Sequence, residues 1–458
     1  MDICCRNNII KKTHQIYMYT LLICLFMRYI SFYALVSPLF DSLLFSSLAI
    51  VGFGIIIFDI FKIDKLYDNK LDTYLTLFLI SLFITSIVNM NRGIFQNFKF
   101  IVWTAISFFI LYLHDKFEDT QETTKKMVFF QNILILLWTF MSSISLITYL
   151  CGVSIEKSLR ENTCLRVGIV EGRLFVIFLN PNNAYIIALF VILFSIFQIF
   201  FKTSYVLPKT VNIINIIIQF IYIVLSKSRG TALVLFVCVS IVSFSISYFK
   251  LKLNKTNKTI ISLIIAILSC IIIFLIMKGI DISFNSIYEF SKSLMSSTKW
   301  ETNRIIRTKR VDFVENNDIS NLRFKIWLSA AEIFKTRWLF GVSPGNIVTY
   351  AKQVLPETFI AKRNYMRSHS VWIGIPLYTG IVGVVIMFGF FLKCFLRSLK
   401  YCINKFTEKI SPMLALQMLI VFLIWVYGLV ELEILFVNSV CSFIFWTSLG
   451  FVRKHVEF

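Results

Sequence analysis

The sequence has few charged residues, few histidines and little proline. Of its 458 residues, 16% are charged, seven are proline and four are histidine, whereas 57% are hydrophobic. Its mean hydropathy is +0.78. A chain with so little polar surface cannot hide its apolar side chains in one water-soluble core, so a soluble globular fold is excluded. Lipid must solvate much of the molecule.

Charges are also missing from many long apolar runs, which approach or exceed the roughly 20 residues that a helix needs to cross a bilayer. Segments such as LALQMLIVFLIWVYGLV are apolar on every face, whereas a transmembrane β-barrel needs alternating segments of about 10 residues. The sequence therefore predicts an all-α, polytopic integral membrane protein. The first run shows no small-residue cleavage pattern and is predicted to be a retained span.

Twelve transmembrane helices are predicted from these runs. They lie near residues 16–36, 43–60, 74–89, 99–113, 129–150, 184–201, 211–226, 230–249, 259–277, 370–392, 412–428 and 433–451. The chain divides accordingly into helices 1–5 (residues 1–150), an outer loop with helices 6–9 (151–277), one large loop between spans 9 and 10 (278–368), and helices 10–12 (369–458).

The net charge of +21 would suggest a nucleic-acid partner in a soluble protein. In a membrane protein the positive-inside rule explains it, so no nucleic acid is expected. With the amino terminus inside, the short inner segments collect most of the lysines and arginines, and the short outer loops carry only Arg92, Lys99, Lys227 and Arg229. Both termini are therefore predicted to be cytoplasmic and the large loop extracytoplasmic.

The ten cysteines lack metal-ligand spacing, and most are expected to be small apolar fillers. Cys151 and Cys164 share an outer loop and could form a disulfide. No DxD-like acidic pair is evident in the outer loops, and no metal site is predicted. No internal repeat is visible, which weakens the case for a transporter built from inverted halves.

The large loop contains a predicted amphipathic helix. In LRFKIWLSAAEIFKTRWLFGV the apolar residues recur at helical spacing, with charges on the other face: Phe324, Trp327, Leu328, Ala331 and Phe334. We expect this helix to lie on the outer surface or to pack against the bundle. VSPGN then ends it, and the basic stretch AKRNYMRSHS returns the chain to the membrane. The loop is predicted to hold an anionic group near the interface.

His369 lies where this basic loop gives way to the apolar run that follows, in SHSVWIGIPLYTGIVG. One interpretation is an interfacial ring hydrogen-bonded to the loop. The other is a general base at the outer mouth of the bundle. The following glycines, Gly374, Gly380 and Gly383, have a simple structural interpretation, because small residues let helices approach closely.

Two further stretches place cations beside apolar spans. Lys227 and Arg229 interrupt two spans in LSKSRGTALVLF, where they either snorkel from an ordinary hairpin or serve function. Arg173 precedes LNPNN, in which Asn182 either caps a helix or contributes to a site. Because guanidinium groups bind diphosphate oxygens bidentately, these residues with Arg323 predict a cationic outer cavity for a lipid-linked anion.

These motifs resemble those of the O-antigen ligase and polymerase superfamily of bacterial polysaccharide export. The family's histidine motif is H, then N, S or Q, nine residues, G, two residues, and G, T or Y, and HSVWIGIPLYTGIVG matches every fixed position. Arg229 to Leu233 is similar to its R-x-x-x-L motif, LNPNN to its NPN segment, and Arg323 to Trp327 with WLFGVSPG to its large-loop signature. The resemblance runs from Arg173 to Gly383, and GVSPG departs from the usual GxGxG.

The resemblance implies an inverting, metal-independent glycosyltransferase of the bacterial inner membrane that needs no cofactor. Its donor would be an undecaprenyl-diphosphate-linked oligosaccharide. His369 would orient or deprotonate the acceptor hydroxyl, and Arg229 and Arg323 would bind the donor diphosphate. Further substrate-binding candidates are Arg173, Lys227 and Asn182. Membrane lipid, a flippase and a chain-length regulator are the expected partners.

Within this family the sequence favours a polymerase of O-antigen or capsule repeat units over a ligase. Richness in Ile, Asn, Lys and Phe suggests an AT-rich genome, whose divergent family members are more often polymerases. A ligase, which transfers finished glycan to a terminal acceptor, remains the alternative. A lipid-linked oligosaccharide flippase would place charges inside several spans and would not need the large loop. A purely structural subunit would tolerate alanine at His369 and at the arginines.

Overall fold

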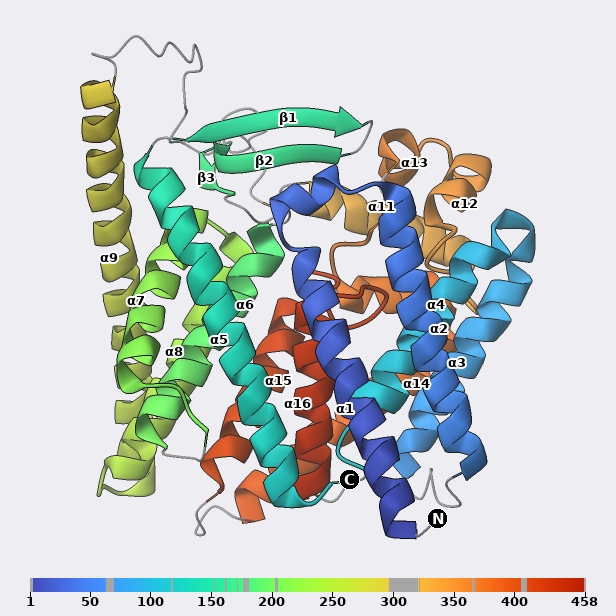
Figure 1. The fold of residues 1–458 in the computed structure, drawn as a ribbon, viewed down its shortest axis with the longest axis horizontal. Helices are drawn as coiled ribbons and strands as arrows, with labels where there is room; N and C mark the ends of the chain where they lie inside the picture. The colour runs from blue at the N-terminus through green and yellow to red at the C-terminus, as the bar shows by residue number, and fades with distance from the viewer. Residues whose placement is uncertain are drawn as a thin grey trace. The chain divides into compact units, whose positions relative to one another are not determined.

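The computed structural model describes residues 3–456 except 63–69, 117, 152, 161–162, 171, 176–180, 202–204, 296–319, 321, 365–366 and 405–409. The chain divides into two compact units (Figure 1). Unit 1 contains residues 1–26, 37–124 and 318–458, and unit 2 contains residues 27–36 and 125–317.

Unit 1 is built from helices at both ends of the sequence. Its first part has α1 (Ile3–Met27), α2 (Pro38–Lys62), α3 (Lys70–Val88), the short η2 (Met90–Arg92), α4 (Ile94–Ile106) and the π-helical turn η3 (Ser107–Leu111). Its second part has α11 (Arg323–Thr336), α12 (Ile347–Val354), α13 (Phe359–Arg363), α14 (Val371–Asn404), α15 (Pro412–Tyr427) and α16 (Val440–Val456). Figure 1 shows α11, α12 and α13 together at one end of this unit.

Unit 2 combines helices with a small sheet. It holds η1 (Ser31–Leu35), most of α5 (Thr120–Leu150), α6 (Pro181–Phe200), α7 (Lys209–Ser226), α8 (Arg229–Lys250) and α9 (Lys255–Met295). Strands β1 (Ser154–Arg160), β2 (Thr163–Val170) and β3 (Arg173–Leu174) form an antiparallel sheet in the order β1-β2-β3. The prediction of a purely helical fold omitted this sheet. Its signal is the run TCLRVGIV, which is rich in the β-branched and apolar residues that favour strands.

The membrane character of the chain is confirmed. Among the described helices, eight are long and apolar enough to cross a bilayer, namely Pro38–Phe61, Ile94–Leu111, Thr120–Leu150, Asn182–Phe200, Lys209–Ser226, Arg229–Lys250, Lys255–Phe290 and Val371–Asn404. Asp72–Val88 and Pro412–Tyr427 are shorter apolar helices. All twelve predicted ranges contain helix, but the structure supports a multi-pass membrane protein without fixing twelve spans.

Several predicted spans have different bounds in the structure, among them the first, the ninth and the twelfth. The first was expected at residues 16–36, but α1 ends at Met27 and a separate 3₁₀ helix occupies Ser31–Leu35. Pro38 begins α2 and disfavours helical geometry at Ser37, which explains why η1 does not continue into α2. The ninth was expected to end at residue 277, yet α9 continues to Met295 and takes up the start of the predicted large loop. The twelfth begins at Val440 rather than 433.

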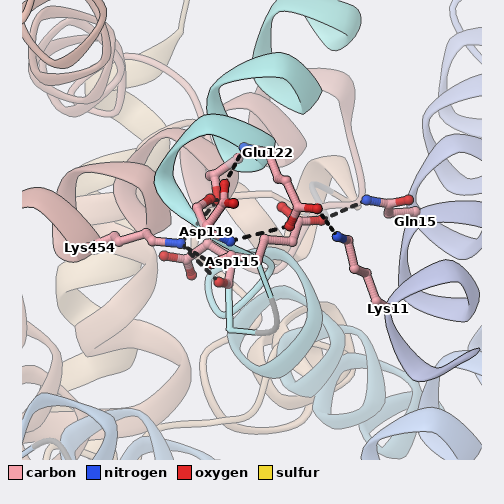
Figure 2. Close-up of polar contacts among 8 residues, drawn as sticks. Lys11, Gln15, Asp115, Asp119, Glu122 and Lys454 are labelled. Carbon is pink, nitrogen blue, oxygen red and sulfur yellow. Dashed lines mark hydrogen bonds and ion pairs between the residues drawn. The ribbon is translucent and has the colours of Figure 1, made fainter. Parts of the chain in front are cut away.

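A cluster of polar side chains connects α1, near the amino terminus, with α16, near the carboxyl terminus of unit 1 (Figure 2). Asp119 and Glu122 form a reciprocal capping box at the start of α5, in which each carboxylate accepts from the other residue's backbone N–H. Lys11 of α1 pairs with Glu122. From α16, the Lys454 ammonium donates to the backbone oxygen of Asp115, 3.3 Å away. The cluster therefore joins α1, the turn before α5 and the end of α16.

Candidate active site

The helix that follows the histidine motif is broken at Gly380. This residue has φ 64° and ψ −167°, which interrupts α14 between Thr379 and Ile381. The segment 338–343, a turn followed by irregular backbone, fills the break: Val342 N–H donates to Leu377 O at 3.0 Å, and Ile381 N–H donates to Trp338 O at 2.8 Å. The backbone groups released by the break are thus satisfied inside the protein, as irregular backbone in a membrane protein requires.

Two glycines make this crossing possible. A Cβ on Gly380 would lie 2.2 Å from the Leu339 oxygen, and one on Gly341 would lie 2.6 Å from the Tyr378 backbone carbon. Both glycines have positive φ. The expected role of Gly380 in close packing is therefore correct, although the partner is a non-helical segment. This segment also contains GVS, the first three residues of the stretch GVSPG that departs from the family pattern.

The loop before α14 is clamped on both sides of His369. The Trp327 indole of α11 donates to Ser368 O at 3.1 Å, and Ser368 Oγ donates to Ser370 O at 2.8 Å. Ser370 Oγ then donates to Gly428 O, at the end of α15, at 3.1 Å. These bonds hold His369 at φ 50°, a left-handed conformation that is unfavourable for a residue with a Cβ. The backbone at the histidine is fixed by its neighbours.

His369 and Arg323 converge on one carboxylate, that of Glu431. Arg323 Nη2 donates to Glu431 Oε1 at 2.6 Å, and His369 Nδ1 lies 3.5 Å from Glu431 Oε2. The Glu431 side chain is 8% exposed, whereas that of His369 is 30% exposed. The result is a buried anion that connects a cation with an imidazole whose ring still reaches solvent. We call Arg323, His369 and Glu431 the histidine cluster.

The predicted amphipathic helix exists as α11, but its buried face differs from the expected one. Its buried residues are Ile326, Ser329, Ala330 and Ile333. Phe324 and Leu328, assigned to the apolar stripe, are 61% and 68% exposed. The reason is that Trp327 and Arg323 turn toward the loop and Glu431, which fixes the rotation of the helix. The Phe324 and Leu328 side chains therefore face away from the described protein.

In unit 2, Arg173 connects three elements. It lies in β3, its side chain is buried, and its Nη2 donates to Asn182 Oδ1 in the first turn of α6 at 2.7 Å. Its Nε donates to Ser226 O, at the end of α7, at 3.2 Å. Arg173 and Asn182, both predicted as substrate-binding residues, thus contact each other. The neighbouring Asn180 lies outside the described residues.

Lys227 and Arg229 form the predicted tight turn. Lys227 ends α7 with φ 51°, and its Nζ lies 3.5 Å from Asp281 Oδ1 of α9. Ser228 caps α8, whose first residue is the half-buried Arg229. Arg173 and Lys227 also line one small pocket, whose other walls come from Tyr149, Ile169, Gly172, Leu174, Leu225 and Asn285. We call Arg173, Asn182, Lys227 and Arg229 the arginine cluster.

The predicted site residues therefore fall into two groups. His369 and Arg323 meet in unit 1, and the arginine cluster belongs to unit 2. The sequence reasoning missed Glu431. Its signal is ELE at residues 431–433, where two carboxylates interrupt an apolar run and both are buried; charges near hydrocarbon are functional candidates by default.

Within the described residues, neither a metal-ligand cluster nor a disulfide at Cys151 is seen near the two groups of site residues. There, no three His, Cys, Asp or Glu side chains lie close enough to hold a metal ion, and metal independence stays a prediction. Cys151 is an exposed free thiol. The side chain of Cys164, its suggested partner, lies outside the described residues.

Comparison with known proteins adds one finding. Residues 214–388 match the model of a family described as O-antigen ligase. This match runs from α7 to the second part of α14 and includes Lys227, Arg229, Arg323 and His369. No curated protein sequence matches the chain.

Proposed function

We propose that this chain, whose residues 214–388 match the model of a family described as O-antigen ligase, belongs to the O-antigen ligase and polymerase superfamily and is a repeat-unit polymerase for a bacterial O-antigen or capsule. It would transfer a glycan from an undecaprenyl-diphosphate-linked donor to the hydroxyl of a lipid-linked acceptor, on the outer side of the cytoplasmic membrane. The observation that carries this proposal is the histidine cluster: a partly exposed imidazole held against a buried carboxylate.

In this reaction His369 is the catalytic base. Its imidazole takes the proton of the acceptor hydroxyl, and the hydroxyl oxygen attacks the anomeric carbon of the donor sugar. The bond from that carbon to the diphosphate oxygen breaks, and undecaprenyl diphosphate leaves with the electron pair. Attack from the face opposite the diphosphate inverts the anomeric configuration.

The arginine cluster would bind the donor diphosphate. Arg229 begins α8, and the amino-terminal end of a helix favours anions. Lys227 and Arg173 line the neighbouring pocket, and Asn182 holds the Arg173 guanidinium in place. Arg323 of unit 1, which donates to Glu431, is likewise proposed to bind an anionic group. Charge that develops on the leaving diphosphate is stabilised by such preorganised donors.

A ligase is the second candidate, because the matching family is described as O-antigen ligase. Both reactions use the same donor and the same chemistry, and they differ in the acceptor. A polymerase accepts a second lipid-linked repeat unit, whereas a ligase accepts a terminal carrier. The product of the reaction, rather than the site, separates the two.

The test is a gel profile of surface and lipid-linked polysaccharide from a deletion strain, complemented with wild type, His369→Ala or the control His455→Ala. His455 is a partly exposed histidine of α16 that stacks on Phe451. Single repeat units that only wild type and His455→Ala convert to long chains would support a polymerase. Long chains that stay on their lipid carrier would mean a ligase. Full rescue by His369→Ala would overturn the catalytic role of His369.

A further inference from the structure

Glu431 is a buried carboxylate in the non-helical stretch between α15 and α16. Its side chain is 8% exposed, and its two oxygens face different partners. Oε1 accepts from Arg323 of α11, and Oε2 lies 3.5 Å from Nδ1 of His369. Glu431 lies beyond residue 388, where the family match ends. Three segments distant in the sequence thus meet at one carboxyl group.

A carboxylate at this depth needs compensation. Removing an ionised carboxyl group from water is costly unless a cation or several hydrogen-bond donors face it. Arg323 supplies both, since its guanidinium is permanently charged and donates to Oε1 at 2.6 Å. The guanidinium thus compensates the carboxylate at Oε1, while Oε2 faces the imidazole.

An ionised carboxylate beside Nδ1 determines which nitrogen of the imidazole acts as a base. A neutral imidazole carries one proton, and an anion beside Nδ1 favours the tautomer with the proton on Nδ1. The lone pair then lies on Nε2. Once Nε2 has taken a proton, the carboxylate also stabilises the imidazolium. A distance of 3.5 Å is compatible with this role, because catalytic hydrogen bonds are often long before substrate binds.

We propose that Glu431 is a positioning residue for His369, a role that rests on the proposed function. In the reaction, the acceptor hydroxyl gives its proton to Nε2 of His369, and its oxygen forms the new bond to the anomeric carbon. The carbon–oxygen bond to the diphosphate breaks in the same step. The imidazolium, held between Glu431 and solvent, later releases the proton to water. Glu431 touches neither sugar and keeps its charge throughout.

The surrounding geometry supports a fixed orientation. The backbone of His369 is held from both sides by the Trp327 and Ser370 hydrogen bonds, so the direction of its Cα–Cβ bond is fixed. Arg323 comes from α11, the helix that also supplies Trp327. The hydrogen bond to the loop before α14 and the ion pair with Glu431 therefore come from the same helix. Any displacement of α11 would affect both contacts.

The experiment uses the full chain in vesicles of phosphatidylethanolamine and phosphatidylglycerol. The substrate is the undecaprenyl-diphosphate-linked glycan extracted from the deletion strain. Initial rates are measured against the concentration of this lipid-linked substrate, which serves as both donor and acceptor, for wild type, Glu431→Gln, Glu431→Asp, His369→Ala and the control Glu357→Gln. Glu357 pairs with Lys362 at an exposed position, with 86% of its side chain accessible. Rates are expressed per folded molecule, after size-exclusion chromatography and thermal melting.

We expect Glu431→Gln to lower kcat by about 10- to 100-fold, a part of the 10²- to 10⁴-fold that general-base catalysis contributes. The apparent KM for the lipid-linked substrate should stay within about twofold, because Glu431 touches neither sugar. Glu431→Asp, which keeps the charge, should recover part of kcat. A purely structural role would change the melting temperature and the folded fraction instead, and Asp would give no recovery per folded molecule.

The outcomes separate the two proposals. If His369→Ala keeps the wild-type rate, the proposed role of the histidine fails. If His369→Ala is inactive but Glu431→Gln matches wild type, only the role of Glu431 is overturned. If Glu431→Gln yields no folded protein, Glu431→Asp decides: an unchanged kcat would overturn the positioning role, and a reduced kcat with an unchanged KM would support it.

Discussion

The indole of Trp327 donates a hydrogen bond to the backbone oxygen of Ser368, at 3.1 Å, one residue before the histidine of the candidate site. This bond connects α11 to the loop that begins α14. Ser368 is fully buried, so its carbonyl has no access to bulk water. The indole N–H therefore has a role beyond the packing of its ring.

Trp327→Phe keeps most of the ring and removes this donor. We expect a loss of about 1 to 3 kcal/mol of stability, because a buried acceptor is left unsatisfied, and a several-fold lower transfer rate because His369 is less firmly held. The matched control is Trp338→Phe, at a position that is 56% exposed. Thermal melting and initial rates measure both effects. Equal behaviour of the two variants would show that the Trp327 bond has no special role.

His369 has a left-handed backbone, so glycine should be tolerated there better than alanine. Both His369→Gly and His369→Ala should be inactive, but the glycine variant should be more stable by about 1 kcal/mol. At the exposed Glu332, inside α11, the order should reverse, because glycine weakens a helix interior by about 1 kcal/mol. Melting temperatures of the four variants provide the comparison. The same order at both positions would contradict the assigned conformation of His369.

Gly380→Ala should be severely destabilising. The added Cβ would lie 2.2 Å from the Leu339 oxygen, at a residue with positive φ, and steric overlap together with backbone strain should cost about 3 kcal/mol or more. Gly54→Ala is the control, since nothing lies within 4 Å of its Cβ position; it should be neutral or slightly stabilising. The yield of monodisperse protein and the melting temperature test this. Near-normal folding of Gly380→Ala would rule out the close crossing.

Arg173→Lys should lower stability more than it raises the KM for the donor. The guanidinium donates in two directions, to Asn182 and to Ser226, and a lysine ammonium lacks this fork geometry. We expect a loss of about 1 to 3 kcal/mol, whereas the exposed Arg363→Lys should change little. Melting curves are measured alongside donor kinetics. A normal melting temperature with a raised donor KM would instead indicate that Arg173 mainly binds substrate.

The stability of unit 1 should fall in acid through Asp115. Burial alone would raise the pKa of this carboxyl, but Arg453, His114 and Lys454 together lower its pKa below the ordinary value. A lowered pKa in the folded state stabilises the protein above the ordinary carboxyl pKa, and this stabilisation is lost as the pH falls through the lowered value. The melting temperature of wild type should therefore decrease below about pH 4.

Asp115→Asn tests the ion pair between Asp115 and Arg453 at neutral pH. Arg453 Nη2 lies 2.6 Å from Asp115 Oδ1, and removing one partner of such a buried pair costs about 3 to 5 kcal/mol. The variant should have a lower melting temperature at pH 7 and a weaker acid dependence than wild type. Parallel acid profiles of the two proteins would exclude Asp115 as the responsible group.

The sequence predicted the helices well where hydropathy alone decides. All twelve expected ranges contain helix because long apolar runs have few alternatives in lipid. The histidine motif was recognisable in the sequence, since it combines a fixed spacing with a change from polar loop to apolar run, and the role of His369 stays a prediction. The break in α14 was not predicted, because a glycine in such a helix is compatible with either close packing or a kink.

Glu431 shows why the rest of the site was missed. It lies far from Arg323 and His369 in the sequence, and no local pattern connects the three. Only the packing of α11 and of the loop after α15 brings its carboxyl group between them. The rotation of α11 was wrong for a similar reason: Phe324 and Leu328 have the helical spacing of a buried stripe, but Trp327 has a specific hydrogen-bond partner that determines the rotation.

The break at Gly380 divides α14 into two helical segments that can move separately. Residues 381–404 form 24 residues of helix, about 36 Å at 1.5 Å per residue, which exceeds the roughly 30 Å hydrocarbon thickness of a bilayer. The nine residues before the break are not needed for crossing, and hydrogen bonds tie their end to the segment after α11. A change in bilayer thickness would change the tilt of the long segment. The short segment that follows His369 would keep its hydrogen bonds to the chain after α11.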